Sequence, residues 1–351
     1  MRKESLEFLK EIVSMPLPSG YERGAQEVWI KYAKEFADET HYDTYGNAVA
    51  ILNPAGKPRL MIMGHCDAVG LIIQYINENG YLYFVQVGGI DPMTLLSQRV
   101  IVHGKKGPVQ GVIGRKAIHM ILPEDRSKAP KNEELWIDIG AKNKADAEKR
   151  VAVGDYVQSI GAFELLINNI AVGSRFDNKV GTWSAIETLR LCKGVKMDAC
   201  IIAVSGVQEE NTGIGASTVA YRLQPDIGIA VDVTHATDYA GAQKEKFSDV
   251  KLGGGPVIEL GPAIHPVVRE GLLDAAKKAK VKVQFNANGG RTGTDADTFV
   301  KIREGIPSAV FSIPNRYMHT TVEVIHLGDL EKIPIVISTY AKTLKKTMKF
   351  V

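Results

Sequence analysis

The spacing of hydrophobic residues changes along this chain of 351 residues, and each change predicts a different kind of structure. Near the start, apolar residues recur every third or fourth position, which predicts two amphipathic helices. Two short apolar runs follow, NAVAIL (47–52) and RLMIMG (59–64), and these predict strands. The helical positions are Leu6, Leu9, Ile12 and Val13 in the first helix and Val28, Tyr32 and Phe36 in the second.

From about residue 71 to residue 160, short apolar runs alternate with turn signals such as NENG and KKG. This pattern predicts a small all-β domain at 71–160, and such a length is ordinary for a domain. The expected strands are IIQYI (72–76), YLYFVQV (81–87), RVIVHG (99–104), VQGVIG (109–114), AIHMI (117–121) and LWIDIG (135–140).

Helical and strand patterns alternate from about residue 165 to the end, which predicts a mostly parallel sheet covered by helices on both faces. Residues 1–70 and 161–351 are therefore expected to form one α/β domain, interrupted by the β-rich domain at 71–160. The expected strands are ACIIAV (199–204), DIGIAVDV (226–233) and SAVFSI (308–313). The expected helices are 178–192, 217–223, 270–280 and a C-terminal helix marked by Ile337, Tyr340, Leu344 and Met348.

The composition is that of an ordinary folded protein, with 45% hydrophobic and 24% charged residues. A net charge of +3 without a basic stripe argues against a nucleic-acid partner. The three cysteines have no CxxC spacing, which argues against a disulfide framework and a thiolate zinc site and favours a reducing compartment. No apolar run approaches the length of a membrane span. These observations predict a soluble, cytoplasmic protein without a membrane partner.

Two adjacent acids, Glu209 and Glu210, follow the buried-strand pattern ACIIAVSG. An acidic pair at this point is often only the first turn of the next helix, where the helix dipole favours negative charge. The end of a parallel strand is also where open α/β folds place their sites. The choice between these two interpretations depends on the other polar residues at element ends.

Five polar residues lie at or near the ends of the expected elements, and four of them accompany parallel-strand candidates. If those strands are neighbours, their carboxyl ends converge on one crevice. Two histidines and three carboxylates without sulfur form a ligand set suited to Zn, Co or Mn. The five residues are His65, Asp177, Glu210, Asp232 and His319.

Each of these residues also has an ordinary structural interpretation. His65 suits a hydrogen-bonded core histidine, and Asp177 suits an N-cap for the helix that follows. Asp232 is harder to explain, because a carboxylate inside an apolar strand must be paired or bound to metal. Three clustered carboxylates raise one another's pKa, and two divalent ions remove that repulsion. Ions about 3.5 to 4 Å apart need one bridging carboxylate, which leaves one histidine and one carboxylate for each ion.

Two further acids lie beside these candidates. Asp67 is two residues after His65, near enough to hydrogen-bond the imidazole nitrogen that faces away from a metal. If Glu210 binds metal, Glu209 is left free to take a proton from water and to pass it to a leaving group. Asp67 and Glu209 are therefore the candidate residues for positioning and for proton transfer.

The motifs of the chain resemble those of the dinuclear metallo-aminopeptidases of the glutamyl aminopeptidase and tetrahedral aminopeptidase type, some of which are labelled endoglucanases. The resemblance spans nearly the whole chain. It departs from the family pattern at Cys66 and Ala68, and at Asn178, where a second aspartate is usual. The motifs are PSGYE (18–22), YGN (45–47), GHCDAVG (64–70), SRFDNKVG (174–181), VQEENTGIGAS (207–217), AVDVT (230–234), GTDAD (293–297) and RYMHTTVEVI (316–325).

The resemblance implies a role for each site residue. Asp177 is expected to bridge two divalent ions, with zinc first and cobalt or manganese as alternatives. The remaining ligands are expected to divide as His65 and Asp232 for one ion and Glu210 and His319 for the other. Glu209 is then the general base on a water between the ions.

The resemblance also implies a fold and partners. We expect a phosphorylase/hydrolase-like α/β domain interrupted by a PDZ-like β domain used for dimerisation, and assembly into homo-oligomers, up to a tetrahedral dodecamer. In this family the bridging aspartate often precedes a cis peptide bond. The expected substrates are peptides with a free N-terminus. Arg291 and His235 are candidates for the pocket of the first side chain, where a cation favours Asp or Glu.

Two other functions stay open from the sequence. A glycosidase that uses two carboxylates needs no metal and tolerates a chelator, but it leaves the two histidines without a role. A self-assembling scaffold with an inactive site needs none of the ligand set. Release of amino acids from short peptides, abolished by a chelator, separates the aminopeptidase from both alternatives.

Overall fold

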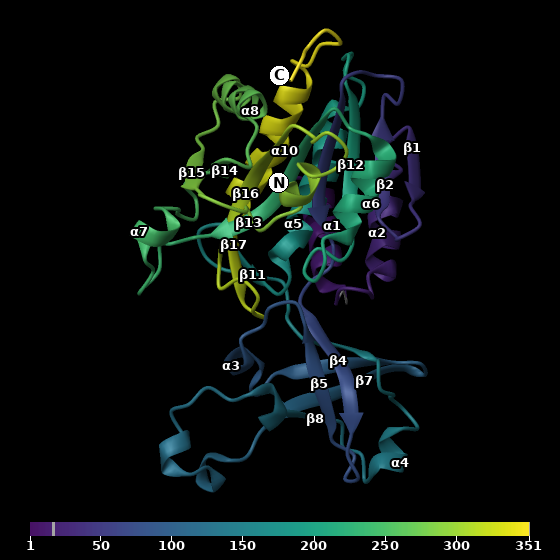
Figure 1. The fold of residues 1–351 in the computed structure, drawn as a ribbon, viewed down its shortest axis with the longest axis vertical. Coiled ribbons are helices and arrows are strands. Elements are labelled where there is room, and N and C mark those ends of the chain that lie inside the picture. Colours follow the sequence, from purple (N-terminus) through teal and green to yellow (C-terminus); the bar gives the residue numbers. More distant parts are fainter. Residues whose placement is uncertain (16–17, 351) are drawn as a thin grey trace.

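The computed structural model describes residues 1–15 and 18–350. Figure 1 shows a large α/β domain that contains both termini, with a smaller β domain below it. The helices are α1 (Lys3–Ser14), α2 (Arg23–Ala33), α3 (Pro92–Leu95), α4 (Lys144–Ala147), α5 (Phe176–Cys192), α6 (Ile214–Leu223), α7 (Lys244–Phe247), α8 (Pro266–Lys278), α9 (Ala296–Phe299) and α10 (Leu327–Ala341), with short 3-10 helices η1 (Ile118–Met120), η2 (Pro123–Asp125) and η3 (Asn132–Glu134).

The strands belong to two separate systems, a sheet in the large domain and a barrel in the small one. The sheet strands are β1 (Glu39–Tyr42), β2 (Ala48–Leu52), β3 (Arg59–His65), β10 (Glu164–Leu165), β11 (Ile170–Gly173), β12 (Cys200–Gly206), β13 (Ile227–His235), β14 (Val257–Leu260), β15 (Gln284–Ala287), β16 (Ser308–Arg316) and β17 (Glu323–His326). The barrel strands are β4 (Gly70–Ile76), β5 (Leu82–Val87), β6 (Arg99–Gly104), β7 (Gly107–Gly114), β8 (Trp136–Asp138) and β9 (Tyr156–Ser159).

Four parallel strands form the centre of the large sheet, in the order β12, β3, β13 and β16. The strands β2 and β17 flank them and run antiparallel to their neighbours. The central strands are buried along almost their whole length, because their sequences are continuous apolar runs rather than alternating ones. The predicted α/β fold with a β insertion is confirmed. The sheet is mixed rather than mostly parallel, because parallel strand pairing among the described residues is confined to these four strands and to β14 with β15, while the outer strands pair antiparallel.

Helices cover both faces of the sheet. Gly64 of β3 faces α5, because a Cβ at this position would overlap the backbone of Gly181. Gly228 of β13 pairs with Met61, three residues before Gly64, and a Cβ there would meet Phe299 of α9 instead. Residues three apart on a strand point to opposite faces. The helices α5 and α9 therefore lie on opposite sides of the same central strands.

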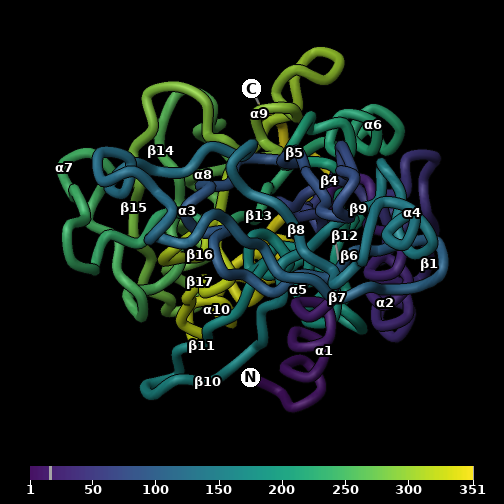
Figure 2. Tube along the Cα trace, turned by 90° about the horizontal axis from the view of Figure 1, so that it is seen from below, coloured from purple at the N-terminus to yellow at the C-terminus, as the bar shows by residue number. Residues whose placement is uncertain are grey.

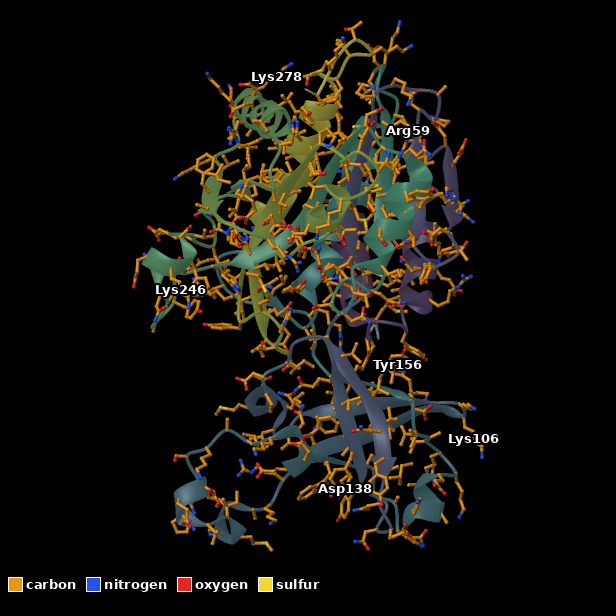
Figure 3. The ribbon with its side chains drawn as sticks, in the orientation of Figure 1. Arg59, Lys106, Asp138, Tyr156, Lys246 and Lys278 are labelled. Atoms are coloured by element: carbon orange, nitrogen blue, oxygen red, sulfur yellow. The ribbon has the colours of Figure 1, made fainter. Side chains whose placement is uncertain are left out.

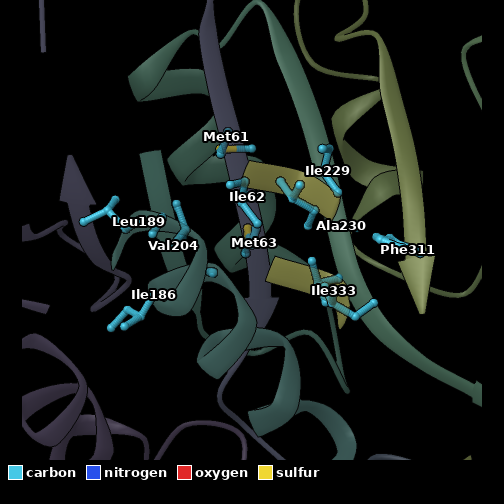
Figure 4. Close-up of a cluster of buried hydrophobic side chains, with 14 of the residues drawn as sticks. Met61, Ile62, Met63, Ile186, Leu189, Val204, Ile229, Ala230, Phe311 and Ile333 are labelled. Carbon is cyan, nitrogen blue, oxygen red and sulfur yellow. The ribbon is translucent and has the colours of Figure 1, made fainter. Parts of the chain in front are cut away.

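The core of the large domain lies on both faces of the sheet, and Figure 4 shows part of it, including Ile62 of β3 and Ile186 of α5. Two buried tryptophans connect the first helices to α5. Trp29 of α2 donates to the carbonyl of Thr182, and Trp183 of α5 donates to the carbonyl of Ser5. Among the described residues, no helix has both the length and the apolar character needed to cross a membrane.

The small domain is a closed barrel of six strands in the order β4, β5, β8, β7, β6 and β9, with antiparallel pairing throughout. Inward-facing residues such as Leu71, Ile73, Leu82 and Val100 form a core of its own. Seen from below, the barrel covers part of the α/β domain (Figure 2). The strands β4 and β9 carry the two connections between the domains.

Two of the expected elements are wrong. AIHMI forms the 3-10 helix η1 rather than a strand, and its apolar residues Ile118 and Met120 are exposed instead of packed. The C-terminal helix ends at Ala341 and does not continue to residue 348. The hydroxyl and the backbone N–H of Thr343 both donate to the carbonyl of Tyr340, so the last turn tightens and the helix stops.

Candidate metal centre

The five predicted ligands gather at the carboxyl edge of the four parallel strands. His65 is the last residue of β3, and Asp232 lies near the end of β13. Glu210 lies in the turn after β12, and His319 lies in the turn between β16 and β17. Asp177 comes from the start of α5, which packs against three of these strands. The strand order thus brings together residues that are far apart in the sequence, such as His65 and His319. We call His65, Asp177, Glu210, Asp232 and His319 the ligand cluster.

Asp177 lies between the two histidines. One oxygen, Oδ1, is 3.3 Å from Nε2 of His65, and the other, Oδ2, is 3.2 Å from Nε2 of His319. Each carboxylate oxygen thus faces a different imidazole. This arrangement is the one that a carboxylate shared between two ions requires.

The remaining acids divide between the two histidines. Oδ1 of Asp232 is 4.0 Å from Nε2 of His65, and Oε2 of Glu210 is 3.5 Å from Nε2 of His319. Ligand atoms of His65, Asp177 and Glu210 all lie within 4.8 Å of one another. The side chain of Glu209 reaches the same space, with Oε2 3.7 Å from Nε2 of His65.

An oxygen holds the outer nitrogen of each imidazole. Nδ1 of His65 is 3.1 Å from the carbonyl oxygen of Asp67 and 3.4 Å from its carboxylate. Nδ1 of His319 is 2.7 Å from the carbonyl oxygen of Gly89, which belongs to the inserted β domain. A proton on each Nδ1 leaves Nε2 with a free lone pair directed into the cluster, as a metal ligand needs.

Asp67 also fixes the acidic pair. Its fully buried carboxylate accepts hydrogen bonds from the backbone N–H groups of Glu209 at 3.0 Å and Glu210 at 3.1 Å, and from the hydroxyl of Ser19 at 2.7 Å. These contacts hold residues 209 and 210 in a turn, and α6 begins only at Ile214. The acidic pair is therefore not the first turn of that helix.

One positioning residue escaped the sequence reasoning. The buried carboxylate of Glu323 on β17 accepts from the backbone N–H of Asp177 and from that of His319, both at 3.0 Å. Burial, with Asp177 nearby, raises the pKa of Glu323 to about 8. The only signal for it in the sequence was an acid within the apolar run of RYMHTTVEVI.

The segment that carries Asp177 has an unusual local structure. The peptide bond between Asp177 and Asn178 is cis, a point that the resemblance left open because Asn178 departs from the family pattern. The amide of Asn178 donates to the carbonyl of Val231 at 2.8 Å and accepts from the N–H of Gly181 at 3.0 Å. Asn178 thus ties the start of α5 to β13, the strand that carries Asp232.

Apart from the two histidines, the acids of the cluster have no positive partner among the described residues. Burial and the neighbouring Asp177 raise the pKa of Glu210 well above its ordinary value, and burial also raises that of Asp232. Oε1 of Glu210 has no hydrogen-bond partner, and no lysine or arginine of residues 1–15 or 18–350 forms an ion pair with these acids. Divalent cations would supply the missing charge and partner, so the residues fit a metal site.

The two candidates for substrate recognition lie in different places. The side chain of Arg291 is exposed and does not line the cavity beside the ligand cluster. His235 lines a cavity of about 400 Å³ beside the cluster. Val233 and Met318, which are adjacent in the sequence to Asp232 and His319, line the same cavity. A pocket for the first side chain of a peptide can therefore include His235.

Comparison with known proteins identifies the family of the chain. The pattern of the M42 glutamyl aminopeptidase family matches residues 46–334. The chain is 32% identical over 339 residues to the lysyl aminopeptidase of Pyrococcus furiosus, and this alignment covers 93% of each chain. The TET aminopeptidase of Thaumarchaeota archaeon SCGC AB-539-E09 superposes with a TM-score of 0.93 at 32% identity over 97% of each chain. The TET1 peptidase of Pyrococcus horikoshii, which can assemble into a tetrahedron or a large octahedral shell, has a TM-score of 0.87 at 31% identity, over 97% of this chain and 100% of that one.

Proposed function

The chain belongs to the M42 family of glutamyl aminopeptidases and is a peptidase, and we propose that it removes N-terminal residues from peptides with two divalent ions held by the ligand cluster. The position of Asp177 carries this proposal, because its two oxygens face His65 and His319 separately. We assign His65 and Asp232 to one ion and Glu210 and His319 to the other. Zinc is the first candidate, and cobalt and manganese suit the same ligands.

When bound, the ions supply Lewis-acid polarisation of the peptide carbonyl and a lowered pKa for water. The chain supplies the proton transfer. Glu209 reaches the cluster without being needed as a ligand, and burial raises its pKa, which favours an acid that can accept and return a proton. We assign Glu209 to take the proton from the attacking water and to give it to the departing amine.

Replacement of Glu209 by glutamine tests this role. The amide keeps the shape of the side chain but accepts no proton, so we expect turnover to fall by about 100-fold to 10,000-fold. Metal content, measured by mass spectrometry of the dialysed protein, should stay at the wild-type value. Glu270→Gln on the exposed surface of α8 is the matched control. Near-normal turnover of Glu209→Gln, measured on aminoacyl p-nitroanilides, would exclude Glu209 as the general base.

We also propose that the chain self-assembles through dimers formed by the inserted β domain, in a cytoplasmic setting. Assembly of the Pyrococcus horikoshii relative supports this, and so do the exposed apolar side chains of Ile118, Met120 and Leu122 on the small domain. Light scattering should show a homo-oligomer for the wild type. Met120→Lys should shift it to smaller species, and an unchanged mass would remove this loop from the interface.

A further inference from the structure

A second feature of the molecule lies beside the ligand cluster, namely the cavity of about 400 Å³ between β13, β14, β15 and β16. Its volume is within the range of small-molecule pockets. The register of β13 and β16 pairs Asp232 with Ser312, and paired residues of neighbouring strands point to the same face. Ser312 lines the cavity, so the cavity begins directly next to a residue of the cluster.

The cavity contains a buried acid. Glu259 of β14 is only 4% exposed, and it is the single carboxylate among the residues that line the cavity. Oε2 of Glu259 accepts from the side-chain amide of Asn286 at 2.8 Å, and the hydroxyls of Thr234 and Ser312 lie beside it. These three neighbours are neutral. The buried carboxylate therefore has one side-chain hydrogen bond, from Asn286, but no counter-charge.

Other features of the cavity also call for a polar ligand. Oγ of Ser312 is buried and has no hydrogen-bond partner among the described residues. Burial raises the pKa of Glu259 to about 7, as expected for an acid whose charge is unpaired. An apolar side chain in this cavity would leave the Ser312 hydroxyl without a partner and the Glu259 carboxylate without a counter-charge, and buried groups in that state are unfavourable.

We propose that this cavity binds the side chain of the N-terminal residue of the substrate and that Glu259 selects a basic side chain, lysine or arginine. The inference rests on the proposed aminopeptidase function, because it places the first residue next to the ions. A side-chain ammonium or guanidinium at the buried end provides the counter-charge that Glu259 lacks.

Lys246, the lysine that lines the cavity, does not prevent the binding of a basic side chain. Lys246 of α7 is exposed, and Figure 3 shows it on the outer side of the α/β domain. Its ammonium lies over the ring of Phe247, 5.0 Å from the centroid, so it belongs to the rim. His235 packs its ring against the same phenylalanine. The charge at the buried end is that of Glu259.

Lysine and norleucine test the charge alone, because norleucine has a straight side chain of similar length without the ammonium. For the protein loaded with zinc, cobalt or manganese, we expect kcat/KM for lysyl p-nitroanilide to exceed that for norleucyl p-nitroanilide by about 10-fold to 100-fold. Glu259→Gln should bring this ratio close to one, chiefly by lowering kcat/KM for the lysyl substrate. Glu245→Gln, an exposed acid on α7, is the matched control and should keep the wild-type ratio.

The outcomes separate this inference from the proposed function. A wild type that prefers glutamyl or leucyl substrates, or a Glu259→Gln variant that keeps the wild-type ratio, would overturn the role of Glu259 and leave the aminopeptidase intact. No hydrolysis of any aminoacyl substrate by the metal-loaded protein would overturn the proposed function itself. If Glu259→Gln is poorly folded, Ser312→Ala, which changes only the neighbouring hydroxyl, should lower the ratio severalfold, and an unchanged ratio there would contradict the proposal.

Discussion

The two halves of the ligand cluster are built differently. His65 and Asp232, the inner half, lie on β3 and β13, which are hydrogen-bonded neighbours in the centre of the sheet. Glu210 and His319, the outer half, lie in turns after β12 and β16, the strands on either side of that pair. The side chain of His65 is 2% exposed and that of His319 is 31% exposed. Strands therefore position the inner half, and turns position the outer half.

The outer half also depends on the inserted domain. The carbonyl of Gly89 holds the imidazole of His319, and His319 itself has a left-handed backbone conformation with φ of 61°. The inner half has no such contact with the barrel, since Asp67 of the α/β domain holds His65. From this difference we expect the inner half to bind its ion more tightly and the outer half to exchange its ion first.

The largest effect should come from the residue that the two halves share. Asp177→Ala removes an oxygen from each half at once, so we expect affinity for both ions to fall by more than about a hundredfold, the upper range for residues that only support ligands. Mass spectrometry of the dialysed variant should find neither ion, and turnover should be lost. A variant that retains two ions would refute the bridge. A variant that retains one would show that the halves do not share Asp177.

The second-largest effect should come from a chelator, which should remove the two ions at different concentrations. We expect the outer ion to leave first, with activity lost at that step, and the inner ion to leave at higher chelator concentration. Burial lowers the pKa of each histidine, but the neighbouring carboxylates raise it overall, to about 10 for His319 and above its ordinary value for His65, so an ion must displace a proton in either half. Affinity of both halves should therefore rise with pH, and the order of release should come from the exposure of His319 instead. Simultaneous loss of both ions at all pH values would contradict the asymmetry.

The difference between strand residues and turn residues also explains which site residues the sequence predicted most clearly. The inner residues lie in or at the end of unbroken apolar runs, so both His65 and Asp232 stood out as polar residues where burial was expected. The strand order that unites all five residues depends on tertiary packing, and only the structure provides it. Whether they bind metal stays a prediction for the experiments above.

The contacts that were missed have a common cause. The Gly89 carbonyl is a backbone group without a sequence signal, and Glu323 acts on two backbone N–H groups that are distant in the chain. The AIHMI run was misassigned for a related reason. Apolar periodicity does not distinguish side chains that pack in a core from exposed ones such as Met120.

Glu323→Gln should affect the outer half more than the inner one. The variant keeps one carbonyl oxygen, so it can accept from Asp177 or His319 but not from both as the carboxylate does. We expect outer-ion affinity to fall by about tenfold to a hundredfold, the usual effect of losing a group that orients a ligand. Glu270→Gln, an exposed acid, serves as the control. Equal losses at both halves would show that Glu323 acts through Asp177 alone.

The smallest effect should come from Ser19→Ala. The hydroxyl of Ser19 donates to Oδ2 of Asp67 at 2.7 Å, but Asp67 keeps the N–H groups of Glu209 and Glu210 after its removal. We expect a loss of about 1 kcal/mol in the free energy of unfolding, typical of one hydrogen bond, and little change in metal content. Ser14→Ala, which removes an exposed hydroxyl bond to the carbonyl of Glu11, is the matched control for denaturant unfolding. A large loss of the inner ion in Ser19→Ala would show instead that the position of His65 depends on the orientation of the Asp67 carboxylate. The strands β3 and β13 alone would then not fix the geometry of the inner half.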